Sequence, residues 1–184
     1  YCSILKELKE ILFGVNIDSV YGDTNISISG ISFDSRQIKQ NNIFIAIKGY
    51  ELDGHNYIDQ SINNGATVVV CETLPKTINK YEIVFIKVKC SKTALYTISS
   101  NLYGNPSSKI DLIGVTGTNG KTTITSLLYK IFNNQGIKSG LISTINIEYE
   151  EFTENSKNTT PDPILLNHHL NEMVKRNIKV CFIE

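Results

Sequence analysis

Glycine, lysine and threonine are concentrated in the segment 115–123, which reads Val-Thr-Gly-Thr-Asn-Gly-Lys-Thr-Thr. A glycine-rich loop between a strand and a helix turns backbone N–H groups toward an anion, and the helix N-terminus adds partial positive charge. Lys121 would reach the β and γ phosphates of a nucleotide, and the Thr122 hydroxyl suits Mg²⁺, which prefers oxygen ligands. The nucleotide site predicted from this chemistry comprises Gly117, Thr118, Asn119, Gly120, Lys121, Thr122 and Thr123.

The segment matches the phosphate-binding pattern in its shorter form. The full pattern, G-x-x-x-x-G-K-[ST], begins with a glycine, and this chain has Val115 there. The shorter pattern, Gly117-x-x-Gly120-Lys121-Thr122, is complete. A tight strand-to-helix turn would account for the glycines alone. It would not account for a lysine and two threonines at the helix start, so we predict nucleotide binding.

Apolar patterning places the loop between elements of an α/β chain. A buried-type strand is predicted at 110–115, and an amphipathic helix follows the loop at 124–132. Further strands are predicted at 139–147 and 179–184, with a helix from Pro161 to Val174 between them. Three strands and two connecting helices are too little to cover both faces of a parallel sheet. We therefore expect a truncated domain, with an apolar sheet edge exposed beside Val180, Phe182 and Ile183.

The first hundred residues show the same alternation. Helices are predicted at 4–12, 57–62 and 91–102, and strands at 27–33, 43–47, 67–71 and 83–86. The cluster Gly104-Asn-Pro-Ser-Ser108 is the strongest break in the middle of the chain. The predicted fold class is α/β: a small N-terminal α/β domain, residues 1–108, followed by the first part of a P-loop parallel-sheet domain, residues 109–184.

Composition excludes several classes of function. Of the 184 residues 41% are hydrophobic, which is typical of a globular protein, and 18 basic residues balance 18 acidic ones. A zero net charge argues against a broad surface for nucleic acid or anionic membrane. The four cysteines have neither zinc-ligand nor disulfide-framework spacing, and no signal or transmembrane run is visible. We expect a soluble, cytoplasmic protein, with His168 and His169 at the surface or partly packed.

Several segments together resemble the Mur ligases, the amide-forming enzymes that build the stem peptide of peptidoglycan. Thr116–Thr123 resembles their ATP loop. The segment Asn158-Thr-Thr-Pro-Asp162 resembles the substrate loop of the members that add the third residue, and Val180–Glu184 resembles a strand of the same members. Three further segments resemble the N-terminal domain shared by the members that add the third residue and the terminal dipeptide: Phe33–Arg36, Asn42–Gly49 and Asp53–His55.

The resemblance implies roles for individual residues. Lys121 would be catalytic within the ATP loop, and Thr122 and Glu184 would be Mg²⁺ ligands. The uridine nucleotide would be bound by Phe33, Ser35, Tyr50, Glu51 and Leu52, and the muramoyl peptide by Asn158, Thr159 and Thr160. Other interpretations are open at three of these places: an ordinary turn at 34–36, helix capping at 160–163, and a surface charge at Glu184.

The activity that the resemblance implies is ATP-driven amide formation through an acyl phosphate. The substrates would be UDP-N-acetylmuramoyl-L-alanyl-D-glutamate and an amino acid, diaminopimelate or lysine, and the whole protein would be a monomer without membrane insertion. The amino-acid-binding domain of the family would lie outside residues 1–184, so we expect no turnover by this chain alone. Alternatives are a ligase adding the terminal dipeptide, a folate polyglutamylating ligase, and a P-loop module without ligase activity.

Overall fold

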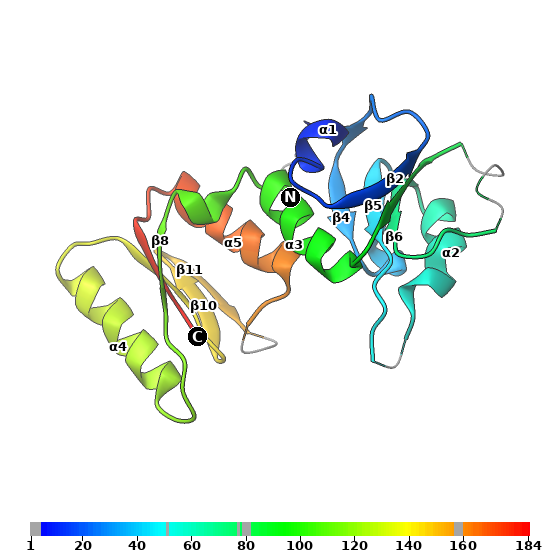
Figure 1. Cartoon of the computed structure of the whole chain (residues 1–184). Coiled ribbons are helices and arrows are strands. Elements are labelled where there is room, and N and C mark those ends of the chain that lie inside the picture. The colour runs from blue at the N-terminus through cyan, green and yellow to red at the C-terminus, as the bar shows by residue number, and fades with distance from the viewer. Residues whose placement is uncertain (1–4, 51, 77, 79–81, 157–159) are drawn as a thin grey trace. The chain divides into compact units, whose positions relative to one another are not determined.

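The computed structural model describes residues 5–50, 52–76, 78, 82–156 and 160–184. The chain divides into two compact units, Tyr1–Leu102 and Tyr103–Glu184 (Figure 1). Helices and strands alternate in both units, which confirms the predicted α/β class. No helix within the described ranges is long and apolar enough to cross a membrane.

The first unit is built on a five-stranded sheet with the strand order β2-β7-β6-β5-β4. Neighbouring strands from β4 to β7 are parallel, and β2 runs antiparallel to β7. The carboxyl ends of β4, β5, β6 and β7 therefore lie along one edge. The strands are β2 (Ile17–Tyr21), β4 (Gly30–Ser32), β5 (Asn42–Ile45), β6 (Ala66–Cys71) and β7 (Val84–Val88), with a separate pair, β1 (Lys6–Glu7) and β3 (Ser27–Ile28). The helices are α1 (Leu8–Ile11), α2 (Ile58–Asn63) and α3 (Ser91–Leu102), with 3₁₀ turns at Ser35–Gln37 and Gly54–Tyr57.

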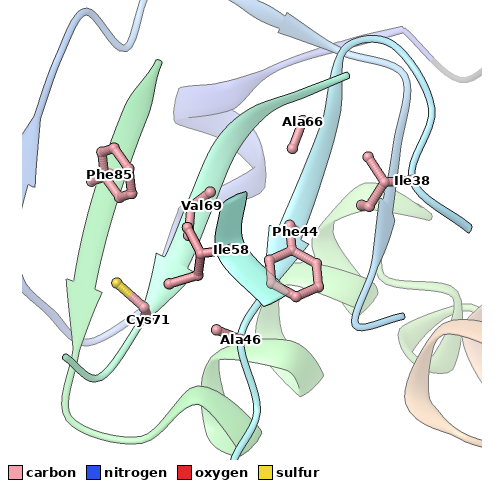
Figure 2. Packing of buried hydrophobic residues seen from close by; sticks show 8 residues of the cluster. All are labelled: Ile38, Phe44, Ala46, Ile58, Ala66, Val69, Cys71 and Phe85. Atoms are coloured by element: carbon pink, nitrogen blue, oxygen red, sulfur yellow. The ribbon is translucent and has the colours of Figure 1, made fainter. Parts of the chain in front are cut away.

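Alternate side chains of the parallel strands form the core beneath α2. Phe44, Val69 and Phe85 come from three neighbouring strands and pack with Ile58 of the helix (Figure 2). All four are at most 3% exposed. Successive side chains of a strand point to opposite faces, so a buried run such as Ala66–Cys71 supplies both faces of the sheet. This packing fixes the strand ends from which the loops of the candidate site project.

The second unit has a mixed sheet with the order β11-β10-β9-β12-β8. Strands β8, β9 and β12 are parallel, and β10 and β11 form an antiparallel extension. The strands are β8 (Asp111–Gly114), β9 (Ser139–Ile142), β10 (Asn146–Tyr149), β11 (Phe152–Asn155) and β12 (Val180–Ile183). The helices are α4 (Lys121–Asn134) and α5 (Pro163–Lys175), with a 3₁₀ turn at Pro106–Ser108.

The two helices of this unit cover opposite faces of the sheet. Phe132 of α4 packs edge-on against Phe182, with the ring centroids 5.0 Å apart. Met173 of α5 packs in a separate cluster with Ile142 and Cys181. Because Cys181 and Phe182 are consecutive in β12, their side chains reach the two faces in turn.

Three predictions about the strands of the second unit were wrong. The predicted strand 139–147 is broken, because Ser143 and Asn146 form a turn in which the Ser143 hydroxyl donates to the Asn146 carbonyl at 2.9 Å. The unit contains the hairpin β10–β11 in addition to the three predicted strands. The predicted exposed edge beside Val180 and Phe182 is also wrong, because β12 lies between β9 and β8. The apolar edge belongs to β8, where Leu112 is 41% exposed.

The N-terminal prediction was also too simple. A helix was predicted at 4–12, but the described part contains β1 followed by a helix of one turn, Leu8–Ile11. The strand predicted at 27–33 is divided into β3 and β4, which belong to different sheets. Strand β2 was not predicted at all. The pairing of β1 with β3 is a tertiary contact that helical spacing of Leu5, Leu8 and Leu12 does not reveal.

His169 is buried, in contrast to the prediction of a surface or partly packed side chain. It is 2% exposed, and its Nδ1 lies 3.3 Å from the hydroxyl of Tyr149 on β10. Its Nε2 is buried and has no hydrogen-bond partner among the described residues; it lies 4.0 Å from a carboxylate oxygen of Glu154 on β11. Burial, followed by the charge of His168, lowers the pKa of His169, and the two acidic neighbours Glu154 and Glu172 only partly oppose this.

The lowered pKa of His169 predicts a pH dependence of stability. The unfolded chain takes up this proton near the usual pKa of 6.5, whereas the folded chain resists it, so the free energy of unfolding should fall as the pH drops below about 6.5. His169→Phe removes the titrating group and should flatten this decline, by at most about 1.4 kcal/mol per pH unit. His168 is present in both proteins, so the difference reports the titration of His169 together with its coupling to the charge of His168. Denaturant unfolding between pH 4.5 and 7.5 measures it, and equal slopes for the two proteins would contradict the assignment.

Candidate functional site

The loop between β8 and α4 contains two glycines with positive φ. Gly117 has φ 153° and Gly120 has φ 78°, in a region that L side chains rarely adopt. Residues 116–120 are exposed, and Gly120 is the residue that precedes the first turn of α4. The strand, the loop and the helix therefore follow one another as predicted from the sequence.

Lys121 lies across this loop. Its Nζ donates to the carbonyl of Gly117 at 2.8 Å and lies 3.5 Å from the carbonyl of Thr118. Both acceptors are exposed and neutral, so an anion in the loop would compete for the ammonium group with a stronger, charge-assisted hydrogen bond. The lysine is held against the loop by these contacts, and its contact with phosphate stays a prediction.

Glu184 connects the start of α4, which follows the glycine loop 115–120, to the ends of two other strands. The hydroxyl of Thr122, in the first turn of α4, donates to Glu184 Oε2 at 2.9 Å and lies 3.1 Å from Oε1. The backbone amide of Thr144, two residues after β9, donates to the same carboxylate. Glu184 itself directly follows β12. The carboxyl ends of the three parallel strands thus meet at one acidic group.

The surroundings of Glu184 favour its ionised form. Burial raises its pKa, but the hydrogen bonds from Thr144 and Thr122 and the charge of Lys121 together hold the pKa below its usual range. A carboxylate that stays charged is suited to bind a cation. The sequence alternative of an ordinary surface charge does not describe this residue, because its oxygens are engaged by the loop helix.

The oxygen donors of this cluster fit Mg²⁺. No group of three His, Cys, Asp or Glu side chains gathers within the described part of the chain. Mg²⁺ does not require such a group, since it commonly takes one or two protein oxygens and completes its shell with water and phosphate. Thr122 and Glu184 offer a hydroxyl and a carboxylate on adjacent elements, which is this kind of partial shell.

Thr160 lies beside the same cluster. Its hydroxyl donates to the backbone carbonyl of Glu184 at 3.1 Å, and its side chain is exposed. Asp162 caps α5 by accepting from the amides of Ile164 and Leu165, so helix capping does explain part of this segment. The predicted residues Asn158 and Thr159 lie outside the described residues.

The other predicted binding residues follow β4 and β5 of the first unit, whose carboxyl ends share one edge. Phe33 is 40% exposed and Tyr50 is fully exposed. Leu52 is also exposed, whereas Ser35 is buried, with its hydroxyl donating to Gln60 Oε1 at 2.8 Å. A hydroxyl that donates once still has lone pairs to accept with. Glu51 lies outside the described residues.

Local hydrogen bonds also shape the 34–36 segment, as the turn interpretation predicts. Asp34 accepts from the Arg36 amide at 3.0 Å and from the guanidinium at 2.8 and 2.9 Å. Hydrogen bonding and the charge of Arg36 outweigh burial and lower the pKa of Asp34. The turn follows Phe33, and Asp34 caps the start of the 3₁₀ segment Ser35–Gln37.

Sequence reasoning missed two participants. Thr144 contributes through its backbone amide, a group that does not depend on residue type and therefore gives no signal in the sequence. His55 links two loops of the first unit through its ring nitrogens. The sequence identified it only as part of the segment Asp53–His55 that resembles the N-terminal domain of the family, and this network was not predicted.

Two family models match the chain. One described as "Mur ligase middle domain" matches residues 115–184, and one described as "Mur ligase family, catalytic domain" matches residues 27–101. The matched segments together include the phosphate loop, Glu184 and the loops after β4 and β5.

Curated relatives match almost the whole chain. A UDP-N-acetylmuramoyl-L-alanyl-D-glutamate–2,6-diaminopimelate ligase from Cytophaga hutchinsonii is 44% identical over 178 residues, which are 97% of this chain and 37% of the relative. A ligase of the same name from Clostridium tetani is 41% identical, with the same coverage of both chains. The chain therefore spans just over a third of the length of these relatives.

Solved structures share the fold. A structure of a ligase with that same name has a TM-score of 0.72 and 22% identity, and the match covers 96% of this chain and 35% of the other. MurF from Acinetobacter baumannii has a TM-score of 0.65 and 19% identity, covering 100% of this chain and 36% of the other.

Substitutions at two glycines test whether the loop before α4 has the backbone conformation described above. A Cβ added at Gly120 or at Gly114 would meet no atom within 4 Å, but only Gly120 has a positive φ. Gly120→Ala should therefore lower the free energy of unfolding by about 1–2 kcal/mol, whereas Gly114→Ala should be neutral or slightly stabilising. Denaturant unfolding of both variants checks this, and equal effects would show that the loop does not hold this conformation.

Proposed function

The chain belongs to the Mur ligase family, and from this premise we propose that it is the nucleotide-binding part of an ATP-dependent ligase that adds the third residue of the peptidoglycan stem peptide. The acceptor substrate would be UDP-N-acetylmuramoyl-L-alanyl-D-glutamate, and the incoming amino acid diaminopimelate or lysine. The observation that carries the proposal is the 44% identity, over nearly the whole chain, to relatives named for the diaminopimelate reaction.

The loop geometry supports ATP as the energy source. The amides of residues 117–123 would receive the phosphates at the start of α4, where the helix dipole favours negative charge. Lys121 would exchange the Gly117 carbonyl for phosphate oxygens and stabilise the charge that develops during transfer. A fold relative from Thermotoga maritima, MurF, was solved in complex with ADP.

Thr122 and Glu184 would hold Mg²⁺ beside these phosphates. Their oxygens are now hydrogen-bonded to each other, so both donors already converge on one place. When bound, Mg²⁺ would offset negative charge on the phosphate oxygens. The low pKa of Glu184 keeps the carboxylate charged for this purpose at neutral pH.

The proposed reaction needs no protein nucleophile. The D-glutamate carboxylate of the substrate attacks the γ-phosphorus of ATP, and ADP leaves. The amino group of the incoming residue then attacks the acyl phosphate, an amide forms, and inorganic phosphate and a proton are released. The chain contributes by positioning the carboxylate and phosphate and by supplying positive charge. Thr160, whose hydroxyl is hydrogen-bonded to the Glu184 carbonyl, would contact the peptide portion of the substrate.

The uridine end of the substrate would bind at the carboxyl edge of the first unit. Open parallel sheets bind ligands at this edge, and the exposed rings of Phe33 and Tyr50 offer apolar surface for a base. Ser35 would accept a hydrogen bond there while still donating to Gln60.

We place the reaction in the cytoplasm and propose that the enzyme is a monomer. The free thiols of Cys71, Cys90 and Cys181 are compatible with a reducing compartment.

The choice of substrates tests the proposal. The whole protein that carries this chain is assayed with ATP and UDP-N-acetylmuramoyl-L-alanyl-D-glutamate, adding diaminopimelate, lysine or neither. Phosphate release coupled to amide formation is expected with one of the two amino acids and not without them. Turnover only with the UDP-muramoyl-tripeptide and D-alanyl-D-alanine would instead assign the dipeptide-adding reaction and contradict the proposal.

A further inference from the structure

Two large side chains beyond the carboxyl end of β5 are exposed. Tyr50 is fully exposed and Leu52 is 65% exposed. Two backbone interactions cross the turn that carries them. The Gly49 amide donates to the Leu52 carbonyl at 2.8 Å, and Lys48 and Asp53 form an antiparallel β-bridge. Gly54 then donates to Ile47 at 2.9 Å. We name the described residues of 48–53 the β5 turn; its shape depends on hydrogen bonds.

A histidine ties the base of the β5 turn to the neighbouring strand. Asp53 Oδ1 lies 2.6 Å from His55 Nδ1 and accepts from the His55 amide at 3.0 Å. The other ring nitrogen, Nε2, accepts from the backbone amide of Glu72 at 3.0 Å, with the Thr73 amide 3.4 Å away. Glu72 directly follows β6.

These partners fix the tautomer of His55. A backbone amide can only donate, so Nε2 must be the unprotonated acceptor, and the proton is on Nδ1. That proton points to the Asp53 carboxylate, whose pKa is lowered by the hydrogen bonds from the His55 amide and ring. The side chain of His55 is 16% exposed, so water replaces few of these contacts.

The network continues to a third loop at the same edge. Glu72 Oε1 accepts from the backbone amide of Ser91, the first residue of α3, at 2.8 Å. Asp53, His55 and Glu72 thus connect the carboxyl ends of β5, β6 and β7, which are parallel neighbours. Strand β6 is almost fully buried, so the β5 turn is anchored to a rigid part of the sheet.

We propose that His55 is a positioning residue that holds the β5 turn, through Asp53 and Glu72, in the shape in which Tyr50 and Leu52 bind a uridine nucleotide. The inference rests on the proposed function, which places that ligand at this edge. His55 does not touch the ligand. Loss of its Nε2 acceptor frees the turn from β6 and weakens binding of the uridine nucleotide, while the phosphate loop of the second unit is unaffected.

Substitutions at His55 separate its two contacts. His55→Gln can place an acceptor near the Nε2 position, and His55→Asn can place a donor near Nδ1 without reaching Glu72. His55→Leu removes both contacts. Asn56→Ala is the matched control, because Asn56 is the exposed neighbour outside the network. Calorimetry on this chain measures the affinity for uridine diphosphate and for Mg·ATP, and thermal unfolding is recorded for every variant.

The expected result is a selective loss. His55→Leu should weaken uridine diphosphate binding about tenfold, His55→Gln should recover most of it, and Asn56→Ala should match the wild type; Mg·ATP affinity should be the same throughout. If His55→Leu does not fold, the test is the comparison of His55→Gln with His55→Asn. The inference predicts that His55→Gln binds uridine diphosphate more tightly than His55→Asn does. Unchanged uridine diphosphate affinity, or equal losses for both ligands, overturns the inference. A wild-type chain that binds Mg·ATP but no uridine diphosphate overturns the proposed uridine site as well.

Discussion

The hydrogen bonds accepted by Glu184 are the interaction on which the candidate site depends. They connect Thr122 of the phosphate-loop helix with the backbone of Thr144, and Glu184 itself continues the central strand β12. A carboxylate in this position would be costly if it were unpaired, because burial disfavours its charge. The donors around it and the nearby charge of Lys121 offset that cost. The same geometry supports the proposed role of Glu184 as a cation ligand, because its charged oxygens lie beside the Thr122 hydroxyl.

Parallel pairing explains why both units carry their candidate residues at strand ends. In each sheet the carboxyl ends of neighbouring parallel strands meet at one edge, where loops are free of the packing that buries the strands. The second unit uses a left-handed glycine loop and a helix start there, which suit phosphate. The first unit uses exposed aromatic side chains and a histidine-centred network, which suit an uncharged base and a defined turn. The two edges thus present different chemistry, as the proposed function requires.

The sequence predicted those features that local residue types determine. The loop at 117–123 and helix α3 follow from glycine positions, caps and apolar spacing. The hairpin β10–β11 was missed because its turn uses Glu150, at φ 50°, in place of the Asn-Gly that usually signals such a turn. The exposed edge was assigned to the last strand because strand order is a tertiary property, and β12 inserts between β8 and β9. The binding roles of all the predicted site residues remain predictions, and Asn158, Thr159 and Glu51 lie outside the described residues.

The central claim is that the loop after β8 binds nucleotide phosphates through Lys121, and calorimetric titration with Mg·ATP tests it most directly. Lys121→Ala removes a charge-assisted contact of about 1.5–3 kcal/mol and should weaken binding roughly tenfold or more. Lys130→Ala is the matched control, because Lys130 is exposed on the same helix and carries the same charge away from the loop. The account predicts wild-type affinity for Lys130→Ala and a large loss for Lys121→Ala. Equal affinity of the wild type and Lys121→Ala would contradict it.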